Sequence, residues 1–544
     1  MNSAPDLAPY YYLSNFQFLV SWVVNRYTDL LTQDELNFVR IFESLPQGSQ
    51  CLYVRLASRA GNLFRADKIK YAEIECIESS ALHLVHAGLI DIHVSLNVSD
   101  LSRVLTKPEL QHLFGQNHKS ERRCDLIDRV AQQYPETKDW HEWTSGIFGH
   151  LYRLKWQELL NTFTLLFFGN THQNLTEFVL QDLGIFRYEN YQIDHQYRIF
   201  KTRDELSLFQ KLSNLREQCE LATLNEELVC IAMQIPASVS SEILLRRKSK
   251  LCNKLANALV RHNNHSLAIE LYRQSHLAPA RECRIRLLEK QGMYAEAWEL
   301  LEAVSKNPID EQELQIFGRL SSRISKKLGR PVIPIINPQL NEKSIFLNKF
   351  NGESRVEEIV RQHINCDSSP CIYVENQLFL GLFGLWLWPE MFRGVDGAFA
   401  NPFQSAPLDM YEQNFTDKRL KITELFELFE SDIYKDHIKH IWKTKLGLAN
   451  HFVNWNFLNE NLIDLALESI PANHLKLIFK RILFDIRNNR SGLPDLIQFF
   501  PESRSYLLIE VKGPGDRIQD NQRRWFNYFS EHNIPAEVLY VSWQ

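Results

Sequence analysis

The chain has 544 residues, which is too long for one hydrophobic core and predicts three or four domains. Hydrophobic residues make up 44% of it and charged residues 23%, as in ordinary globular proteins. Its nine cysteines include no Cys-x-x-Cys pair, which argues against a zinc ribbon and a secreted disulfide framework, and the net charge of −5 does not by itself indicate a nucleic-acid partner.

Residues 1–95 are predicted to form a helical region that binds DNA. Met1–Pro9 lacks the basic start of a signal peptide. Within the region, Cys51–Leu56 is expected to be a strand. Basic residues are then interleaved with aromatic ones, which suits a surface for the DNA backbone and suits an ordinary helix exterior almost as well; the basic residues are Arg55, Arg59, Arg65, Lys68 and Lys70.

Residues 96–135 are predicted to form two short helices around a basic loop. Thr106 can cap the first helix, with a proline just inside it and Glu109 three residues on, as in a capping box. The second amphipathic helix follows the loop at Lys119–Arg123. The pair resembles a SAP module, a small DNA-binding hairpin of helices, and a generic helical hairpin is the alternative.

Residues 136–330 are predicted to be a helical linker followed by tetratricopeptide-like repeats. Leu-Ala-Ile-Glu-Leu-Tyr from Leu267 recurs as Glu-Ala-Trp-Glu-Leu-Leu from Glu296, 29 residues later. Two copies are too few to define an array, so a helical scaffold is the expectation.

This scaffold carries the most basic segment of the chain, Arg246–Lys290, with eleven Lys or Arg residues against three Glu residues, or +8. Such a segment attracts a polyanion by releasing its counterions, whereas the alternative is a solvated helix face. The DNA-binding candidates are Arg246, Arg247, Lys248, Lys250, Arg281, Arg284, Arg286 and Lys290.

Residues 331–544 are predicted to be the last domain, because Pro331, Pro334 and Pro338 punctuate a connector at its start. Its apolar run Leu378–Trp388 is shorter than the roughly 20 residues that span a membrane, so a buried core helix is expected and no membrane partner.

A β-hairpin near the C-terminus brings three charged residues together. The runs Leu496–Phe500 and Tyr506–Val511 flank a turn whose centre falls between residues 502 and 503. Antiparallel pairing about that centre places Asp495 opposite Glu510, and the two-residue period of a strand places Glu510 and Lys512 on one face.

These three residues predict a metal-dependent phosphodiesterase centre. Two facing carboxylates repel unless a cation lies between them, and a hard divalent ion such as Mg²⁺ or Mn²⁺ is the natural one. Lys512 can then orient a water or stabilise charge that grows on phosphorus. Gln522 and Arg523, on a helix expected after Gly513–Asp516, are predicted to lie nearby and to bind DNA. The alternative is a plain salt bridge between Lys512 and a carboxylate.

The pattern Pro-Asp…Glu-x-Lys resembles the restriction-endonuclease-like superfamily, and its continuation Glu-Val-Lys-Gly-Pro-Gly-Asp-Arg, with Gln522 and Trp525, resembles the VRR-type nuclease domain. That resemblance implies two ions, Mg²⁺ or Mn²⁺. It implies as metal ligands Asp495, Glu510, the main-chain carbonyl of Val511, and Glu375 at the start of the apolar helix. The alternative is that Glu375 binds no metal and lies in the first turn of the helix because the helix dipole favours a negative charge there.

The whole arrangement resembles the Fanconi-associated nuclease family, as does the passage from Gly394 to Asp409. The fold class expected is therefore multidomain and mainly α, with helical N-terminal and repeat-like domains before a C-terminal α/β restriction-endonuclease-like domain. The resemblance implies a structure-specific nuclease that cuts near 5′ flaps, degrades DNA from a 5′ end and acts in interstrand-crosslink repair. The partner is branched or flapped DNA, with no nicotinamide or flavin cofactor. No zinc-finger pattern of the larger members is present at the N-terminus.

The family further implies a bacterial member working in the cytoplasm at the nucleoid, or a nuclear protein if the source is eukaryotic. The alternatives are a Holliday-junction resolvase, a non-catalytic DNA-binding adaptor and a site-specific restriction enzyme. Selection of a 5′ end calls for a pocket that binds a terminal phosphate, and its densest candidate is the group Arg281, Arg284, Arg286 and Lys290, for which a solvated helix is again the alternative.

Overall fold

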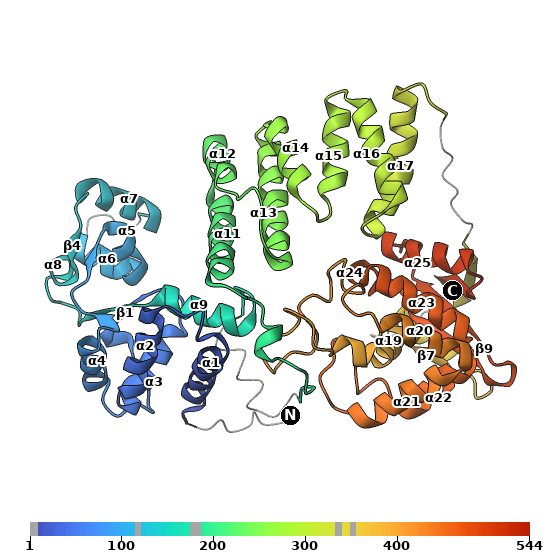
Figure 1. Ribbon diagram of the computed structural model, residues 1–544, viewed down its shortest axis with the longest axis horizontal. Coiled ribbons are helices and arrows are strands. Elements are labelled where there is room, and N and C mark those ends of the chain that lie inside the picture. The colour runs from blue at the N-terminus through green and yellow to red at the C-terminus, as the bar shows by residue number, and fades with distance from the viewer. Residues whose placement is uncertain (1–8, 115–120, 174–186, 332–339, 349–354) are drawn as a thin grey trace. The chain divides into compact units, whose positions relative to one another are not determined.

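The computed structural model describes residues 9–114, 121–173, 187–331, 340–348 and 355–544. Contacts divide the chain into two compact units, Met1–Arg187 and Tyr188–Gln544. Helices predominate throughout and β-strands form small sheets, so the expected mainly α, multidomain fold class is confirmed (Figure 1). In the described part of the chain, no helix combines the length and the apolar character needed to cross a lipid bilayer.

The first half of unit 1 is a bundle of helices next to a three-stranded sheet of order β1-β5-β2. Its elements are α1 (Tyr11–Tyr27), α2 (Gln33–Ser44), α3 (Gln47–Ala57), β1 (Leu63–Arg65), α4 (Ile77–His86), β2 (Ile90–Asp91), β5 (Leu151–Leu154) and α9 (Gln157–Phe168). The strand expected at Cys51–Leu56 is wrong, because these residues lie in α3. Most of them are buried, and an apolar run that is buried on all sides has no period that separates a helix from a strand.

The second half of unit 1 contains the two helices that were predicted around a basic loop. Its elements are β3 (Ser95–Leu96), α5 (Val98–Val104), α6 (Lys107–Phe114), α7 (Arg123–Gln133), β4 (Lys138–Asp139) and α8 (Trp140–Thr144). At the start of α6, Glu109 accepts hydrogen bonds from the Thr106 backbone N–H at 2.8 Å and from its hydroxyl at 2.9 Å. Part of the loop, including Lys119, lies outside the described residues.

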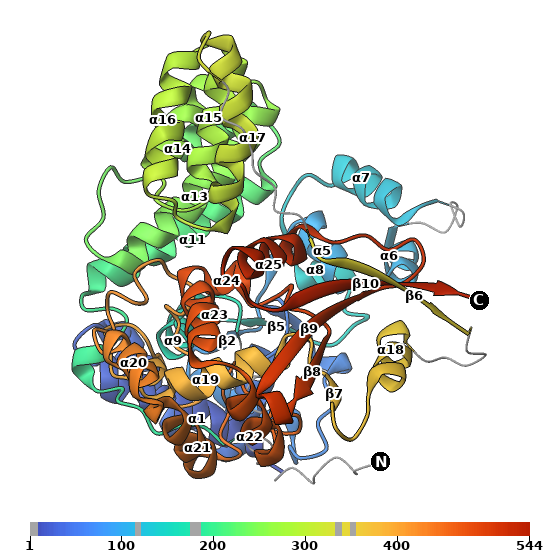
Figure 2. The ribbon, with the colours of Figure 1, turned by 90° about the vertical axis from the view of Figure 1, so that its right-hand side faces the viewer.

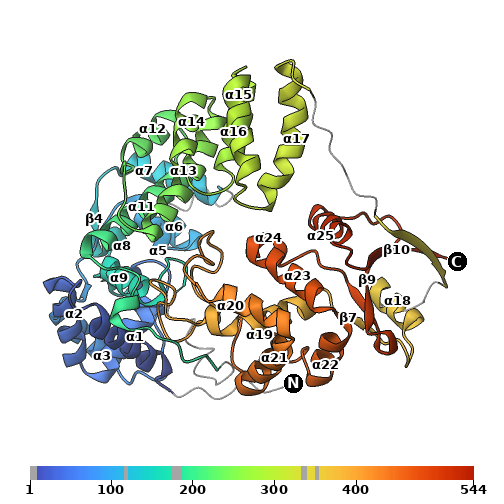
Figure 3. The ribbon, with the colours of Figure 1, turned by 45° about the vertical axis from the view of Figure 1, so that its right-hand side comes forward.

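Unit 2 begins with antiparallel helices that pack side by side in chain order (Figures 1 and 3). They are α11 (Arg203–Leu221), α12 (Asn225–Met233), α13 (Glu242–Arg261), α14 (His265–Gln274), α15 (Ala280–Lys290), α16 (Tyr294–Lys306) and α17 (Glu311–Lys327). The sequence echo falls on α14 and α16, the second members of two successive pairs, so the predicted helical scaffold is confirmed. Pro334 and Pro338 of the predicted connector lie outside the described residues.

The rest of unit 2 is built around a five-stranded mixed sheet of order β6-β10-β9-β8-β7 (Figure 2). The strands are β6 (Glu342–Leu347), β7 (Cys371–Tyr373), β8 (Leu496–Phe500), β9 (Ser505–Lys512) and β10 (Ala536–Trp543). Strand β8 runs antiparallel to both β7 and β9, and β10 runs parallel to both β9 and β6.

Helices cover both faces of this sheet. One face packs against α18 (Val356–Ile364). The other faces a larger core shared by α19 (Gln377–Met391), α20 (Ile422–Glu427), α21 (Ile433–Lys445), α22 (Glu460–Ser469), α23 (Ala472–Phe484), α24 (Ile486–Asn489) and α25 (Asp520–Glu531).

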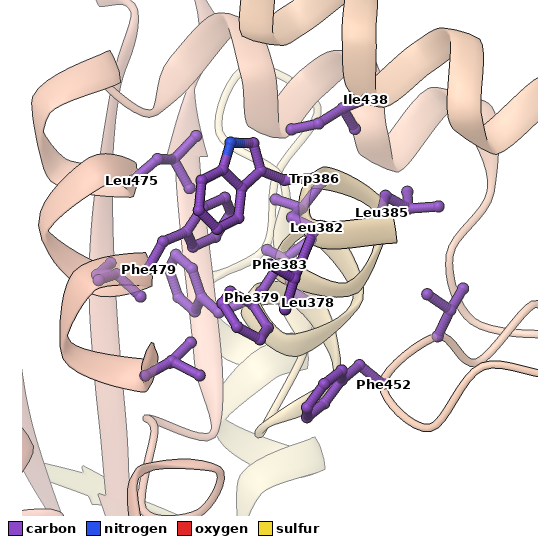
Figure 4. Packing of buried hydrophobic residues seen from close by; sticks show 14 of the residues in the cluster. Leu378, Phe379, Leu382, Phe383, Leu385, Trp386, Ile438, Phe452, Leu475 and Phe479 are labelled. Atoms are coloured by element: carbon purple, nitrogen blue, oxygen red, sulfur yellow. The ribbon is translucent and has the colours of Figure 1, made fainter. Parts of the chain in front are cut away.

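The predicted core helix Leu378–Trp388 is confirmed as α19, which lies at the centre of that larger core. Phe383 and Trp386 each pack within 6 Å of the Phe479 ring of α23 (Figure 4). Gly384 allows close packing on another side of α19, because a Cβ there would lie 2.8 Å from Phe452. Helix α19 is therefore packed on all sides by apolar side chains of the core next to the sheet.

Candidate active site

The β8–β9 hairpin has the register that the sequence predicts. Leu496 pairs with Ile509 and Phe500 pairs with Ser505, and a short 3₁₀ turn (Pro501–Ser503) joins the strands. The same register continued by one position sets Asp495 opposite Glu510. The Asp495 carboxylate accepts a hydrogen bond from the Val511 backbone N–H at 3.0 Å, which fixes it against the end of β9.

Glu510 and Lys512 lie on one face of β9, as predicted, and both are almost fully buried. The Lys512 Nζ is 2.8 Å from Glu510 Oε1. Gln522 from the first turn of α25 joins them: its side-chain amide N–H donates to Glu510 Oε1, and its amide oxygen accepts from Lys512 Nζ at 3.0 Å. Gln522 was predicted to lie near this centre, and its side chain is part of the charged cluster. Its predicted contact with DNA stays a prediction.

Burial changes the protonation of both carboxylates. It raises the pKa of Asp495 to about 6, and the negative charges of Glu357 and Glu375 act in the same direction. Burial, and then the charge of Asp495, raises the pKa of Glu510 to about 8, although Lys512 acts against this. The ionised form of each carboxylate is therefore disfavoured at this site. A bound cation would stabilise that form.

Glu375 reaches the same end of the sheet from β7. It lies just before α19, with a positive φ of 39°, and its backbone N–H donates to the Asp495 carbonyl at 2.9 Å. Its carboxylate accepts a hydrogen bond from the Tyr373 hydroxyl at 2.8 Å. The positive φ is a strained backbone conformation for a non-glycine residue. The predicted role of Glu375 as a metal ligand stays a prediction.

The donors at this end of the sheet suit a hard divalent ion. All are carboxylate or main-chain oxygens, which Mg²⁺ and Mn²⁺ prefer. Oε2 of Glu510 is buried without a hydrogen-bond partner in the described part of the chain. Among the described residues, however, no three acidic, His or Cys side chains are already gathered at ligand spacing.

Most cations of the basic segment are engaged within the protein. Arg246 pairs with Glu412 at 2.5 Å, and the Arg247 guanidinium donates to Ser213 at 2.6 Å. Lys248 is buried and donates to the Ala237 carbonyl at 2.7 Å. Much of the positive charge in the basic segment is therefore engaged in contacts between α13 and neighbouring parts of the protein.

The four cations predicted to bind a terminal phosphate do not converge. Arg281 is held by Glu313 and by the Asn307 carbonyl, and Arg286 is 2.7 Å from Glu282. Lys290 lies 3.4 Å from His265. The side chain of Arg284 is partly buried, and burial lowers its pKa.

A different group of cations surrounds Lys250 of α13, and we call it the arginine cluster. Burial lowers the pKa of Lys250 to about 8, with further lowering by surrounding arginines. The cluster consists of Lys250 with Arg216, Arg246, Arg247 and Arg487. Sequence reasoning missed Arg216 and Arg487 because each stands in a stretch of unremarkable charge. The only available signal was the position of Arg487, a few residues before Asp495.

The ring of Tyr411 and the imidazole of His451 lie next to the arginine cluster. The Arg487 guanidinium lies 5.1 Å from the Tyr411 ring centre. Arg490 donates to the Tyr411 hydroxyl at 2.8 Å, and His451 Nε2 is 2.7 Å from the same hydroxyl. Arg523, the remaining predicted DNA contact, is exposed on α25 beside the charged centre.

Family models match three parts of the chain. The VRR-NUC domain matches residues 430–543, the "FAN1, HTH domain" matches residues 10–91, and the "Fanconi anemia-associated nuclease SAP domain" matches residues 95–143. The last match agrees with the SAP-like hairpin expected from the sequence.

Whole proteins and solved structures resemble the chain along its length. A Fanconi-associated nuclease 1 homolog of Pseudomonas aeruginosa is 37% identical, over 100% of this chain and 98% of that protein. A homolog from Oryza sativa is 25% identical, over 98% of this chain and 62% of that protein. A crystal structure of paFAN1 bound to 5′ flap DNA has a TM-score of 0.88 at 37% identity and covers 99% of this chain and 100% of that one.

Proposed function

Because this chain belongs to the Fanconi-associated nuclease family, we propose that it cuts branched DNA near a 5′ flap, with Asp495, Glu510 and Lys512 as its catalytic residues. It is a structure-specific DNA nuclease, and the similar structure bound to 5′ flap DNA supports the choice of flap. The observation that carries the proposal is the meeting of two carboxylates and one lysine at the end of the hairpin, with raised carboxylate pKa values and an unpartnered Glu510 oxygen.

The metal part of the proposal concerns two divalent ions, Mg²⁺ or Mn²⁺, at this centre. Asp495, Glu510, Glu375 and the Val511 carbonyl would hold them. When bound, such ions polarise a phosphate oxygen and lower the pKa of a water.

The chain's own residues orient the reactants. Hydrolysis joins the oxygen of water to phosphorus and breaks one phosphorus–oxygen ester bond, and the departing alkoxide takes up a proton. Lys512 can hold the attacking water or stabilise the charge that grows on phosphorus. Gln522 is a positioning residue, because it holds the ammonium group of Lys512 and the carboxylate of Glu510 at fixed positions.

Binding of the 5′ end is assigned to the arginine cluster. A terminal phosphate carries more negative charge than an internal one, so grouped guanidinium groups distinguish it by charge-assisted bonds. Lys250 and Arg487 have no carboxylate partner among the described residues, whereas Arg281 and Arg286 are neutralised by Glu313 and Glu282. This pocket would favour cutting at a set distance from a 5′ end and repeated 5′-to-3′ degradation, as unhooking of an interstrand crosslink requires. In a bacterium, the enzyme would work in the cytoplasm at the nucleoid.

The deciding experiment compares end-labelled substrates in the presence of Mn²⁺. Single-stranded, duplex, 5′-flap, 3′-flap and four-way DNA are incubated with the full chain, and the cuts are mapped. We expect the 5′ flap to be cut fastest, and faster with a 5′-phosphate than with a 5′-hydroxyl. Equal cutting of all substrates would contradict the proposal, and paired symmetric cuts in the four-way junction would favour a resolvase.

Two substitutions test the pocket in the same assay. Lys250→Ala and Arg487→Ala should remove the preference for a 5′-phosphate, while Arg286→Ala should keep it. If the first two variants keep the preference for a 5′-phosphate, the pocket that binds the 5′ end must be formed by other residues. A non-catalytic adaptor, the remaining alternative, would cut none of the substrates.

A further inference from the structure

Helix α18 brings a further acidic side chain to the end of β9. Val356, Ile359 and Val360 of α18 pack with Ile509 and Val511 on the sheet face opposite α25 (Figure 2). The first turn of α18 lies against the residue that follows Lys512, because a Cβ on Gly513 would be 3.5 Å from the Val356 side chain. Glu357, the next residue along the chain, therefore stands beside the catalytic end of the strand.

Two adjacent glutamates of α18 have different surroundings. Glu358 is 2.7 Å from Arg361, and that guanidinium lowers its pKa to about 2. Glu357 has no hydrogen bond or ion pair among the described residues, and its charge raises the pKa of both Asp495 and Glu510. Glu358 is thus neutralised on its own helix, whereas the negative charge of Glu357 acts on the catalytic carboxylates.

The charges at the centre indicate how many ions it can hold. Glu357, Glu375, Asp495 and Glu510 contribute −4 when ionised and Lys512 contributes +1, which leaves −3. One divalent ion leaves −1, and one DNA phosphodiester returns the sum to −2. Two ions with one phosphodiester bring it to zero. Uncompensated charge in a buried site is costly, so the full set of side chains is balanced by two ions.

We propose that Glu357 is a ligand of a second divalent ion at this centre, directly or through a bound water. The proposal rests on the metal-dependent nuclease function proposed above. Oε2 of Glu510, which is buried and has no hydrogen-bond partner among the described residues, would be a further oxygen ligand at the same centre. Glu357 would add its carboxylate to the site from the sheet face opposite α25.

The test is Mn²⁺ binding by titration calorimetry on the full chain, which does not depend on cleavage. The parent should bind two ions. Glu357→Gln should lose one of them or bind it at least tenfold more weakly, and the matched variant Glu358→Gln should bind as the parent does. Tenfold weaker binding also reduces the stabilisation that saturating Mn²⁺ confers, by about 1.4 kcal/mol.

Thermal unfolding supplies a second measurement that separates metal binding from a structural role. In EDTA, Glu357→Gln should melt at a higher temperature than the parent, because a like charge has been removed. With Mn²⁺ its melting temperature should rise by less than that of the parent. A variant that is less stable in both conditions would mark Glu357 as structural.

The remaining outcomes overturn one proposal or both. An isotherm of Glu357→Gln that matches a two-ion parent overturns the role of Glu357 and leaves the nuclease proposal intact. A parent that binds a single ion contradicts the second site. A parent that binds no Mn²⁺ and cuts without it overturns the proposed metal dependence, and the role of Glu357 with it.

Discussion

At the scale of single residues, burial of the charged cluster at the end of β9 costs folding free energy. Glu510 and Lys512 are both almost completely buried, and Lys512 does not fully offset the effect of burial on Glu510. A protein under selection for stability alone would gain by replacing such a group with apolar side chains. The proposed binding of a cation by the ionised carboxylates would offset this cost.

The first prediction concerns the three proposed catalytic residues. Asp495→Asn, Glu510→Gln and Lys512→Ala should each lower the cleavage rate by about 10²-fold or more, because each removes a group that acts in the transition state. Affinity for flap DNA should stay within a few-fold, as measured by fluorescence anisotropy. Glu502→Gln is the control, since Glu502 is an exposed carboxylate in the turn at the far end of the same hairpin. Parent-like cleavage by any of the three variants would contradict the assignment.

The second prediction concerns the stability of the metal-free protein as a function of pH. Asp495 and Glu510 have raised pKa values in the fold, about 6 and about 8, against roughly 4 in an unfolded chain. A raised folded pKa contributes stability below the unfolded pKa, and that contribution is lost as pH rises through the folded pKa. In EDTA, the melting temperature of the parent relative to an Asp495→Asn/Glu510→Gln variant should therefore fall between about pH 4 and pH 8.

Mn²⁺ should oppose this loss, because the ion binds the ionised carboxylates. Melting curves at several pH values with and without Mn²⁺ measure the difference directly. A constant gap between parent and double variant across the range would show that these two carboxylates titrate normally.

At the scale of elements, α25 must sit close to the turn before β8 for Gln522 to reach Glu510. Gly492 makes this approach possible. Its φ is +90°, and a Cβ there would lie 2.8 Å from the Asn521 backbone. Trp525 also fastens the helix to this turn by donating to the Ser491 carbonyl at 3.2 Å.

The third prediction follows from that contact. Gly492→Ala should destabilise the domain by about 1–2 kcal/mol from backbone strain alone and should lower cleavage further, because α25 and Gln522 must shift. Gly447→Ala is the matched control: its φ is +81°, but a Cβ there would meet no atom within 4 Å. Urea unfolding and cleavage rates of the two variants separate the effect of backbone strain from the effect of the steric clash with Asn521. Equal losses of activity in both would argue against the close approach of α25.

At the scale of the whole molecule, the helical scaffold is joined to the nuclease fold by buried polar contacts within unit 2. Glu311, in the first turn of α17, is almost fully buried and accepts from Arg481 at 3.0 Å and from Asn489 at 3.1 Å. Its backbone N–H donates to Asp485 at 3.1 Å. The Arg481 guanidinium also lies 4.4 Å from the ring centre of Tyr528 on α25. The same contacts therefore reach the helix that carries Gln522.

The fourth prediction tests this joint. Glu311→Gln should lower the free energy of unfolding of unit 2 by about 3 kcal/mol, because it leaves the buried guanidinium of Arg481 without a counter-charge. Glu299→Gln, at an exposed position on the neighbouring helix α16, should change it by less than about 0.5 kcal/mol. Chemical denaturation followed by tryptophan fluorescence gives both values. A parent-like midpoint for Glu311→Gln would mean that the helical scaffold is held to the nuclease fold by other contacts.

The basic segment shows how the scaffold changes what a charge pattern means. Residues 246–290 carry a net +8 in the sequence, yet Arg246, Arg281 and Arg286 each pair with a carboxylate. Their partners Glu412 and Glu313 lie outside the segment. A local count of charges therefore overestimates the positive surface that remains available to DNA.

The amino-acid sequence alone determined the hairpin and its register. Turn residues at 501–504 and two apolar runs fix the centre of pairing, and pairing about one centre places Asp495 beside Glu510 and Glu510 beside Lys512. Helix α19 was equally predictable, because a long apolar run bounded by polar residues has few other solutions. Both are local properties, set by residues that are near one another along the chain.

Tertiary structure decided everything that depends on distant neighbours. It placed Cys51–Leu56 in a helix, set the Gln522 side chain between Glu510 and Lys512, and packed α18, which carries Glu357, against the sheet. It also gathered Lys250, Arg216 and Arg487 from three helices. Burial, pairing and like-charge repulsion act through space at a few ångströms, and the order of residues along a single chain does not specify which of them come within that distance.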